Sequence, residues 1–296
     1  MAHVTHKIRL YPNKNQLPWL RKACGISRFI YNWALTEWSK QYEDFKQDNT
    51  KLKPSRFGLA NQLNKLKNSD SNLKWLTETS DQPAQNALQD LDTAFKKFFK
   101  KQASYPVFKK SKSKCSFRQY VRTKIFINGK LKLASLKEPI KMAEQWRFAP
   151  DAKFLFLTVS EKNNKWYAAI TAEIPDHTLP KGLDSDPIGI DLGITTLATL
   201  SNGQKLTKRK TRKKDKERIK RLSRRLSKKQ KGSKNRLKAK AKLARFHEKL
   251  ANRREYDTQT ITTSLARQYE NIVLETLNIT GMMKNHKLAG ALSDAS

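Results

Sequence analysis

The chain has 296 residues, enough for two or three compact units that each bury a core. Lys and Arg number 62 against 26 Asp and Glu, a net charge of +36, so we expect a polyanionic partner, above all nucleic acid. No stretch approaches the ~18 apolar residues of a spanning helix, and no signal-peptide core is found near the start. The composition therefore predicts a cytosolic protein with no membrane partner and no small-molecule substrate.

Cysteine content bears on metals. Cys24 and Cys115 are the only cysteines in the chain. Two isolated cysteines make neither a disulfide framework nor a Cys-x-x-Cys zinc module, so we do not expect this chain to bind zinc.

The first hundred residues predict one strand followed by helices. Val4 to Tyr11 alternates apolar and basic residues and stops at Pro12, as a short strand would. Apolar residues at helical spacing between Leu17 and Trp38 predict a helix. A polar linker is expected up to about Leu73. Asp81 as N-cap, with an apolar stripe after it, predicts a second helix whose stripe packs in a core.

Basic and aromatic residues alternate between residues 105 and 124. Such a pattern suits a surface where cations hold phosphates and rings stack on bases, but half-buried strands show the same alternation. Both interpretations stay open. The candidate contacts to nucleic acid are Tyr105, Phe108, Lys109, Lys110 and Arg118.

Two hairpins are predicted beyond this segment. Asn128-Gly129 suits a tight primed turn, and Asn163-Asn164 separates two further apolar runs. Residues 104–178 are therefore expected to form a small antiparallel sheet or barrel. The stretch from Pro175 to Pro187, rich in Asp and Pro, is the best candidate for a domain boundary.

Two carboxylates sit on apolar β-type segments. Asp191 lies within Pro187–Thr196, and Glu275 lies within Asn271–Leu277, at the end of a second expected strand. We expect both strands to be buried, where an unpaired charge would cost several kcal/mol, so each acid needs a partner. A strand-end turn or an ion pair to Lys would explain either acid alone.

Together, the two acids predict a divalent metal site. Metal-assisted phosphodiester hydrolysis needs carboxylates that bridge and flank two cations, and oxygen ligands suit Mg²⁺ or Mn²⁺. A strand with Asp191, a hairpin, and a later strand with Glu275 after a helix follow the element order of an RNase H-like fold. We assign both residues catalytic and metal-binding roles.

An ATPase interpretation competes with this one. Ile188–Thr196 also resembles the first phosphate loop of actin-like and Hsp70-like ATPases. However, the residues after Glu275 do not form a second Asp-x-Gly phosphate loop. Nucleotide binding is therefore the less favoured hypothesis.

A strongly basic segment spans Thr207–Arg254, with 24 Lys and Arg against three acids. Apolar residues share one face before and after Gly232-Ser233, which predicts a helical hairpin. A solvated charged hairpin is possible, but such self-repulsion favours an anionic partner. The candidate nucleic-acid contacts here are Arg221, Arg224, Arg225, Lys228, Lys229, Lys234, Arg236, Arg253 and Arg254.

Several motifs in one order resemble the TnpB (OrfB-type) family, transposon-encoded RNA-guided nucleases related to compact type V CRISPR effectors. The resemblance covers essentially the whole chain. The motifs are residues 9–12 (RLYP), 28–35 (RFIYNWAL), 94–99 (AFKKFF), 105–109 (YPVFK), 189–193 (GIDLG), 226–235 (LSKKQKGSKN) and 275–282 (ETLNITGM).

The resemblance implies an α+β multidomain fold. Residues 1–10 and 104–178 would form a wedge-type β-barrel, and residues 11–103 a helical recognition insertion. Residues 185–296 would form an incomplete RuvC-like (RNase H-like) α/β domain, with the basic helical hairpin at 207–254 inserted. The implied activity is Mg²⁺-dependent, RNA-guided cleavage of DNA, with guide RNA and target DNA as partners in the prokaryotic, nucleoid-associated cytoplasm.

The resemblance also places Asp191 and Glu275 on the first two of three catalytic carboxylates. The third, and a four-cysteine zinc ribbon before it, would follow Ser296. We therefore expect a truncated nuclease, possible loss of cleavage, and weaker metal binding because Thr276 stands where the family tends to have an acid. Alternatives are a nuclease-deficient regulator that binds nucleic acid and a general RNA-binding protein; a transposase that joins strands itself ranks lower.

Overall fold

A computed structural model describes residues 2–110, 115–121, 125–144, 148, 151–175, 182–193, 196–207 and 213–285. The chain divides into two compact units, Met1–Thr178 and Leu179–Ser296. The division falls inside the segment between Pro175 and Pro187 that the composition marks as a boundary. Each unit is described by itself below.

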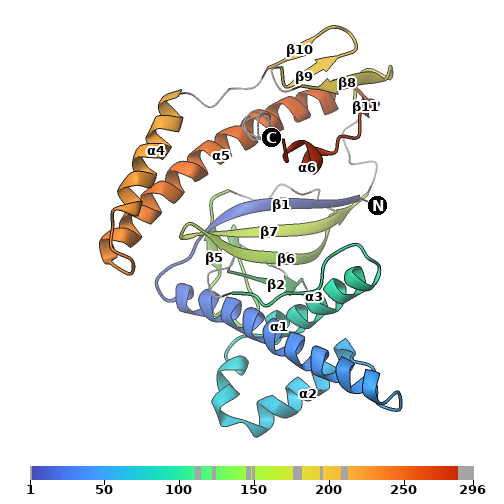
Figure 1. Cartoon of the computed structure of the whole chain (residues 1–296), viewed down its shortest axis with the longest axis vertical. Helices are drawn as coiled ribbons and strands as arrows, with labels where there is room; N and C mark the ends of the chain where they lie inside the picture. Colours follow the sequence, from blue (N-terminus) through green and yellow to red (C-terminus); the bar gives the residue numbers. More distant parts are fainter. Residues whose placement is uncertain are drawn as a thin grey trace. The chain divides into compact units, whose positions relative to one another are not determined.

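The first unit contains one antiparallel seven-stranded sheet, curled like half a barrel (Figure 1). The strand order is β2-β6-β7-β1-β5-β4-β3, so the N-terminal strand lies in the middle of the sheet. The antiparallel sheet expected from the sequence is confirmed, although its described strands leave an open order rather than a closed barrel. The strands are β1 Ala2–Tyr11, β2 Ser116–Tyr120, β3 Phe126–Ile127, β4 Lys130–Leu131, β5 Ile140–Met142, β6 Lys153–Lys162 and β7 Lys165–Ile174.

Both predicted hairpins are confirmed by their turns. Asn128 and Gly129 have φ angles of 49° and 69°, and Asn163 and Asn164 have φ angles of 52° and 61°. Two consecutive positive φ values define the primed turn whose twist matches that of paired strands. The turn residues therefore fix the registers Phe126↔Leu131 and Lys162↔Lys165.

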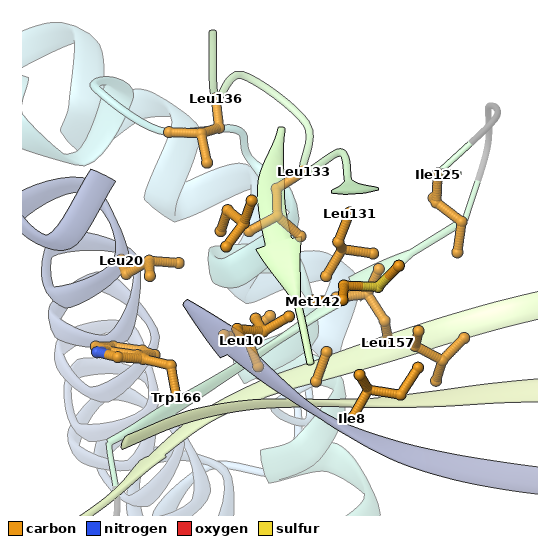
Figure 2. Packing of buried hydrophobic residues seen from close by; sticks show 14 of the residues in the cluster. Ile8, Leu10, Leu20, Ile125, Leu131, Leu133, Leu136, Met142, Leu157 and Trp166 are labelled. Atoms are coloured by element: carbon orange, nitrogen blue, oxygen red, sulfur yellow. The ribbon is translucent and has the colours of Figure 1, made fainter. Parts of the chain in front are cut away.

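Apolar side chains on the concave side of this sheet form its core (Figure 2). Ile8 and Leu10 of β1 alternate with exposed residues and are fully or almost fully buried. They pack with Trp166 of β7 and with Leu20 of the first helix. The period-two pattern of β1 thus places Ile8 and Leu10 on the face of the strand that contributes to the core.

Four helical segments complete the first unit: α1 Gln16–Gln47, α2 Arg56–Ser69, the 3-10 helix η1 Ser71–Thr77, and α3 Gln82–Phe99. Trp38 of α1 stacks on Phe95 of α3, with ring centroids 4.6 Å apart. The predicted helices are confirmed, and the stripe of α3 packs in the core as expected. Asp81 precedes α3, but its side chain pairs with Lys67 instead of capping the helix.

The expectation of a polar linker up to Leu73 is wrong, because the end of α1, helix α2 and the start of η1 occupy most of it. Leu59 and Leu63, one helical turn apart, are buried against α1 and α3. The Ser55 hydroxyl accepts a hydrogen bond from the Gly58 backbone N–H and caps α2. Two apolar residues among many polar ones give only a weak helical pattern in the sequence. The helix is stabilised mainly by the burial of these residues against the other helices.

The second unit holds a four-stranded sheet of order β10-β9-β8-β11. Its strands are β8 Ile188–Leu192, β9 Ala198–Leu200, β10 Lys205–Leu206 and β11 Ile272–Leu274. The β9 and β10 pairings are antiparallel, whereas β11 runs parallel to β8. Ile188, Ile190 and Tyr269 pack on one face of the sheet. This topology confirms a mixed α/β unit and leaves the RuvC-like assignment as a prediction.

Two long helices, α4 Lys213–Ser227 and α5 Lys234–Gln268, form the predicted basic hairpin (Figure 1). Leu222, Phe246 and Leu250 are buried between them. Gly232 takes a φ of 87° in the turn, and the Ser233 hydroxyl accepts from the Arg236 N–H to cap α5. A four-residue helix, α6 Ile279–Met282, follows β11.

Candidate metal and nucleic-acid site

The parallel pairing of β8 and β11 places the two candidate ligands at one edge of the sheet. The register ends with Leu274 opposite Ile190; Asp191 is the next residue of β8, and Glu275 is the first residue after β11. Adjacent strands are about 4.8 Å apart, and residues in register point to the same face. We therefore infer that Asp191, on the face of β8 opposite the buried Ile190, has Glu275 as a neighbour just beyond the end of β11.

The expectation that these carboxylates are buried is wrong. Asp191 and Glu275 are exposed, and so is all of β11, where Val273 is 60% and Leu274 56% exposed. Asp191 alternates with Ile190 and so faces away from the core, while β11 is the edge strand. The acids therefore remain hydrated, and the argument that burial forces each to have a partner does not apply.

The pair of carboxylates fits a hard divalent cation in its donor chemistry. Asp and Glu oxygens are ligands of Mg²⁺ and Mn²⁺, and such cations keep several water or phosphate oxygens as further ligands. Within the described part of the chain, no group of three or more His, Cys, Asp or Glu lies in metal-binding proximity. These two residues would thus supply a partial protein ligand set.

The segment around Tyr105 and Lys109 packs on the helices of the first unit. Tyr105 contacts the Ser39 hydroxyl at 2.8 Å and packs edge-on against Phe95. Lys109 exchanges two backbone hydrogen bonds with the Asn32 side chain, and its Nζ lies 3.8 Å from the centroid of the Tyr31 ring. Burial lowers the pKa of Lys109, although Asp90 partly offsets this. These contacts favour the packing interpretation for both residues.

Arg118 also has an intramolecular partner. Its guanidinium pairs with Asp90 at 3.1 Å and lies over the Phe156 ring of β6. Phe108, in contrast, is 58% exposed, and Lys110 is exposed beside it. Contact with nucleic acid stays a prediction for all five residues of this region.

The basic hairpin presents one cationic helix face. A groove of about 370 Å³ follows α4 and is lined by Glu217, Lys220, Arg221, Arg224, Arg225 and Lys228. These positions recur every three or four residues, so they share one face, opposite the buried Leu222. Four of the nine predicted contacts in the hairpin thus line one groove. Lys220, which is not among the predicted contacts, lines the same groove. Lys229 and Lys234 are exposed near the turn.

Two other predicted contacts hold the hairpin together. Arg236 Nη1 donates to the backbone carbonyls of Leu226 and Lys229, at 2.9 and 2.7 Å. It thus provides a hydrogen-bond donor for carbonyl groups at the C-terminal end of α4, which have no partner within the helix. Arg253 pairs with the buried Asp215 at 3.1 Å. Arg254 is half-buried. Arg236 and Arg253 therefore have structural contacts, and nucleic-acid binding by all three arginines stays a prediction.

An aromatic pocket in the first unit is not evident from the sequence. It has a volume of about 290 Å³ and is lined by Trp38, Tyr42, Phe45, Lys53, Pro54 and Phe99. Lys53 lies over the Phe45 ring, and Phe99 is 54% exposed. Exposed rings beside a cation can stack on an unpaired base. No local signal marks this pocket, because its residues come from α1, the segment before α2, and α3.

No helix in the described ranges has the length and apolar character needed to cross a membrane.

Comparison with known proteins places the chain in a family. The OrfB (IS605-type) family model described as "Probable transposase" matches residues 156–286, and its companion described as "Helix-turn-helix domain" matches residues 1–47. Residues 2–47 form β1 and the single helix α1 here, joined by a short turn, so this match marks relatedness rather than two helices.

Two curated proteins are similar along nearly the whole chain. A protein of Streptomyces pristinaespiralis named "Putative RNA-guided DNA endonuclease" is 34% identical over 292 residues, which cover 98% of this chain and 71% of the relative. "Putative RNA-guided DNA endonuclease InsQ" of Escherichia coli (strain K12) is 31% identical, covering 97% and 69%. The chain therefore belongs to the TnpB (OrfB) family of transposon-associated proteins.

A solved structure, "Cryo-EM structure of the Cas12f1-sgRNA-target DNA complex", also matches. The match has a TM-score of 0.47 and 14% sequence identity, and it covers 96% of this chain and 70% of that one.

Proposed function

We propose that this protein is a transposon-associated, RNA-guided DNA endonuclease whose partners are a guide RNA and a target DNA. The observation that carries this function is the parallel register of β8 and β11, from which we infer that the exposed Asp191 and Glu275 are neighbours. Family membership and the net charge of +36 support the same function.

The two carboxylates would hold Mg²⁺ or Mn²⁺. Cations bound there would neutralise charge on the scissile phosphate and lower the pKa of the attacking water. Asp191 and Glu275 would orient those cations toward solvent, where a phosphodiester can approach, because neither side chain is covered. Asp191 lies on β8 and Glu275 directly follows β11, so paired strands hold the backbone next to both acids.

Nucleic acid would be held largely by the α4 face, where Arg221, Arg224, Arg225 and Lys228 line one groove. We assign residues 1–10 and 104–178 to a wedge-like domain and residues 11–103 to a recognition insertion. Residues 185–296 are assigned to a RuvC-like domain, with the hairpin at 207–254 inserted in it.

The test is DNA cleavage by the full chain purified with its co-expressed RNA. We expect cutting of a guide-matched target with Mg²⁺ or Mn²⁺, none with a chelator, and none by Asp191→Asn or Glu275→Gln. Asp186→Asn and Glu270→Gln are matched controls, because they remove exposed acids in the same unit. Cleavage that persists in Asp191→Asn, at the wild-type rate, would contradict the proposed site.

A nuclease-deficient regulator that binds nucleic acid is the second candidate. The α4 face favours it, because that face is exposed and needs no metal to bind phosphates. Guide-dependent DNA binding with no cleavage under any divalent cation would select this function over the nuclease.

A further inference from the structure

The only two cysteines of the chain pack in one apolar cluster, although they are far apart in the sequence. Cys24, on α1, is buried with 4% of its surface exposed, and the half-buried Cys115 directly precedes β2. Both pack in the apolar cluster that joins α1 to the sheet, close enough for their thiol groups to interact. Both are free thiols in this structure.

The surroundings make the two thiols unequal. The hydrogen bond from Cys24 lowers the pKa of Cys115, assisted by Arg28 and Arg21 and opposed by burial and by Glu161. The same hydrogen bond and burial raise the pKa of Cys24. Arg21 and Arg28 lie one turn before and one turn after Cys24 on α1, so the helix itself presents both cations.

We propose that Cys115 and Cys24 are a peroxide-reactive pair that closes a reversible disulfide between α1 and β2. Reactive cysteines are accessible and thiolate-favouring, and they often have a second cysteine within reach. Cys115 is the more accessible of the two cysteines, and Cys24 is the buried partner packed in the same cluster. This arrangement does not depend on the proposed nuclease function.

The reaction balances with hydrogen peroxide as the oxidant. The Cys115 thiolate attacks one peroxide oxygen, the O–O bond breaks, and the hydroxide released takes up a proton, leaving a sulfenic acid on Cys115. The Cys24 sulfur, losing its proton, then attacks the Cys115 sulfur and the sulfenic oxygen leaves as water. Overall, two thiols and one peroxide give one disulfide and two waters.

The disulfide would tie α1 to the edge strand of the sheet. The loop it closes contains α2, η1 and α3, so it constrains the whole helical part of the first unit. We expect oxidised protein to show a higher melting temperature than reduced protein, reversed by a dithiol reductant.

The experiment treats the full chain with hydrogen peroxide and maps peptides by mass spectrometry without reduction. We expect one intramolecular Cys24–Cys115 linkage with the loss of two hydrogen atoms. In Cys24→Ser, a dimedone adduct should form on Cys115, whereas Cys115→Ser should leave Cys24 largely unmodified. No linkage in the wild type, linkage only between chains, or faster modification of Cys24 would overturn the proposal.

A second measurement follows the rate at which iodoacetamide alkylates Cys115 in Cys24→Ser across pH. Adding Arg28→Gln should slow alkylation several-fold at neutral pH and move the rate profile to higher pH, while Glu161→Gln should do the opposite. Lys22→Gln, which removes a cation of α1 paired with Glu78, is the matched control. Equal profiles for Arg28→Gln and Lys22→Gln would contradict the role given to Arg28.

Discussion

Leu274 lies opposite Ile190 in the parallel pair of β8 and β11, and this register determines which residues of the two segments are neighbours. A shift by one residue would turn Glu275 to the opposite face from Asp191, because side chains alternate along a strand. The candidate metal site is thus a property of strand pairing, and it can be tested through variants of either acid.

Asp191→Asn and Glu275→Gln should abolish metal-dependent cleavage without loss of stability. Both side chains are exposed, so each change should alter the free energy of unfolding by no more than about 0.5 kcal/mol. Because the two acids act as one unit, the double variant should be no less active than either single variant. Thermal melts and cleavage assays check this; destabilisation beyond about 1 kcal/mol would contradict the exposure.

Asp215→Asn should loosen the basic hairpin. Asp215 is buried and pairs with Arg253, so its neutralisation should cost roughly 1–3 kcal/mol of local stability. Hydrogen exchange in α4 and α5 should speed up, while exchange in β1 and β7 should not change. Glu217→Gln, on the exposed face of α4, is the matched control and should leave exchange unaltered.

Neutralising the cationic face of α4 should change the salt dependence of binding. Each of Arg221→Gln, Arg224→Gln and Lys228→Gln should reduce the slope of log K against log salt by about 0.7–0.9 for each phosphate that the side chain no longer neutralises. Fluorescence anisotropy with RNA at several salt concentrations measures this slope. Lys205→Gln, an exposed lysine of β10, is the matched control; an equal effect there would indicate diffuse charge instead of a defined face.

Lys109 should make stability depend on alkaline pH. Its folded pKa lies below the usual 10.5, so between these two values the unfolded chain binds more protons than the folded chain. Stability should therefore rise with pH through this window relative to Lys109→Met, which lacks the titrating group. Urea midpoints at several pH values test this, with Lys110→Met as control; a fall in stability over the window would be inconsistent with a lowered pKa.

Phe99→Ala should weaken binding of single-stranded RNA by about 1–3 kcal/mol if the aromatic pocket stacks a base. Phe99 is the exposed ring of that pocket, so its loss should affect the fold little. Phe57→Ala removes another exposed ring, of α2, outside the pocket lining, and serves as the matched control. Equal losses of RNA affinity in both variants would contradict base stacking in the aromatic pocket.

Local patterns in the sequence predicted much of the fold. The Asn-Gly and Asn-Asn turns, the alternation in β1 and the stripe of α3 are set by residues close together in the chain, and all are confirmed. Helix α2 was missed because Leu59 and Leu63 become significant only when α1 and α3 cover them.

The candidate site was predictable in its residue types but not in its environment. Apolar neighbours suggested a buried Asp191, yet burial depends on whether another layer covers that face, which a strand sequence does not encode. Likewise, nothing in the sequence separates Arg236 and Arg253, which make structural contacts, from the exposed Arg221. Only the fold distinguishes a cation that binds a carbonyl from one that is available to a phosphate.

Helix α5 runs without a break for 35 residues, from the hairpin turn to Tyr269, which packs beneath β8. At 1.5 Å per residue it is about 50 Å long, comparable to about 15 base pairs of duplex DNA at 3.4 Å each. The length of this helix thus determines the distance between the hairpin turn and the sheet that carries the candidate carboxylates. An inserted residue would lengthen the helix little, but it would rotate one end against the other by roughly 100°. The orientation of the hairpin turn relative to the sheet is therefore more sensitive to helix length than the distance between them.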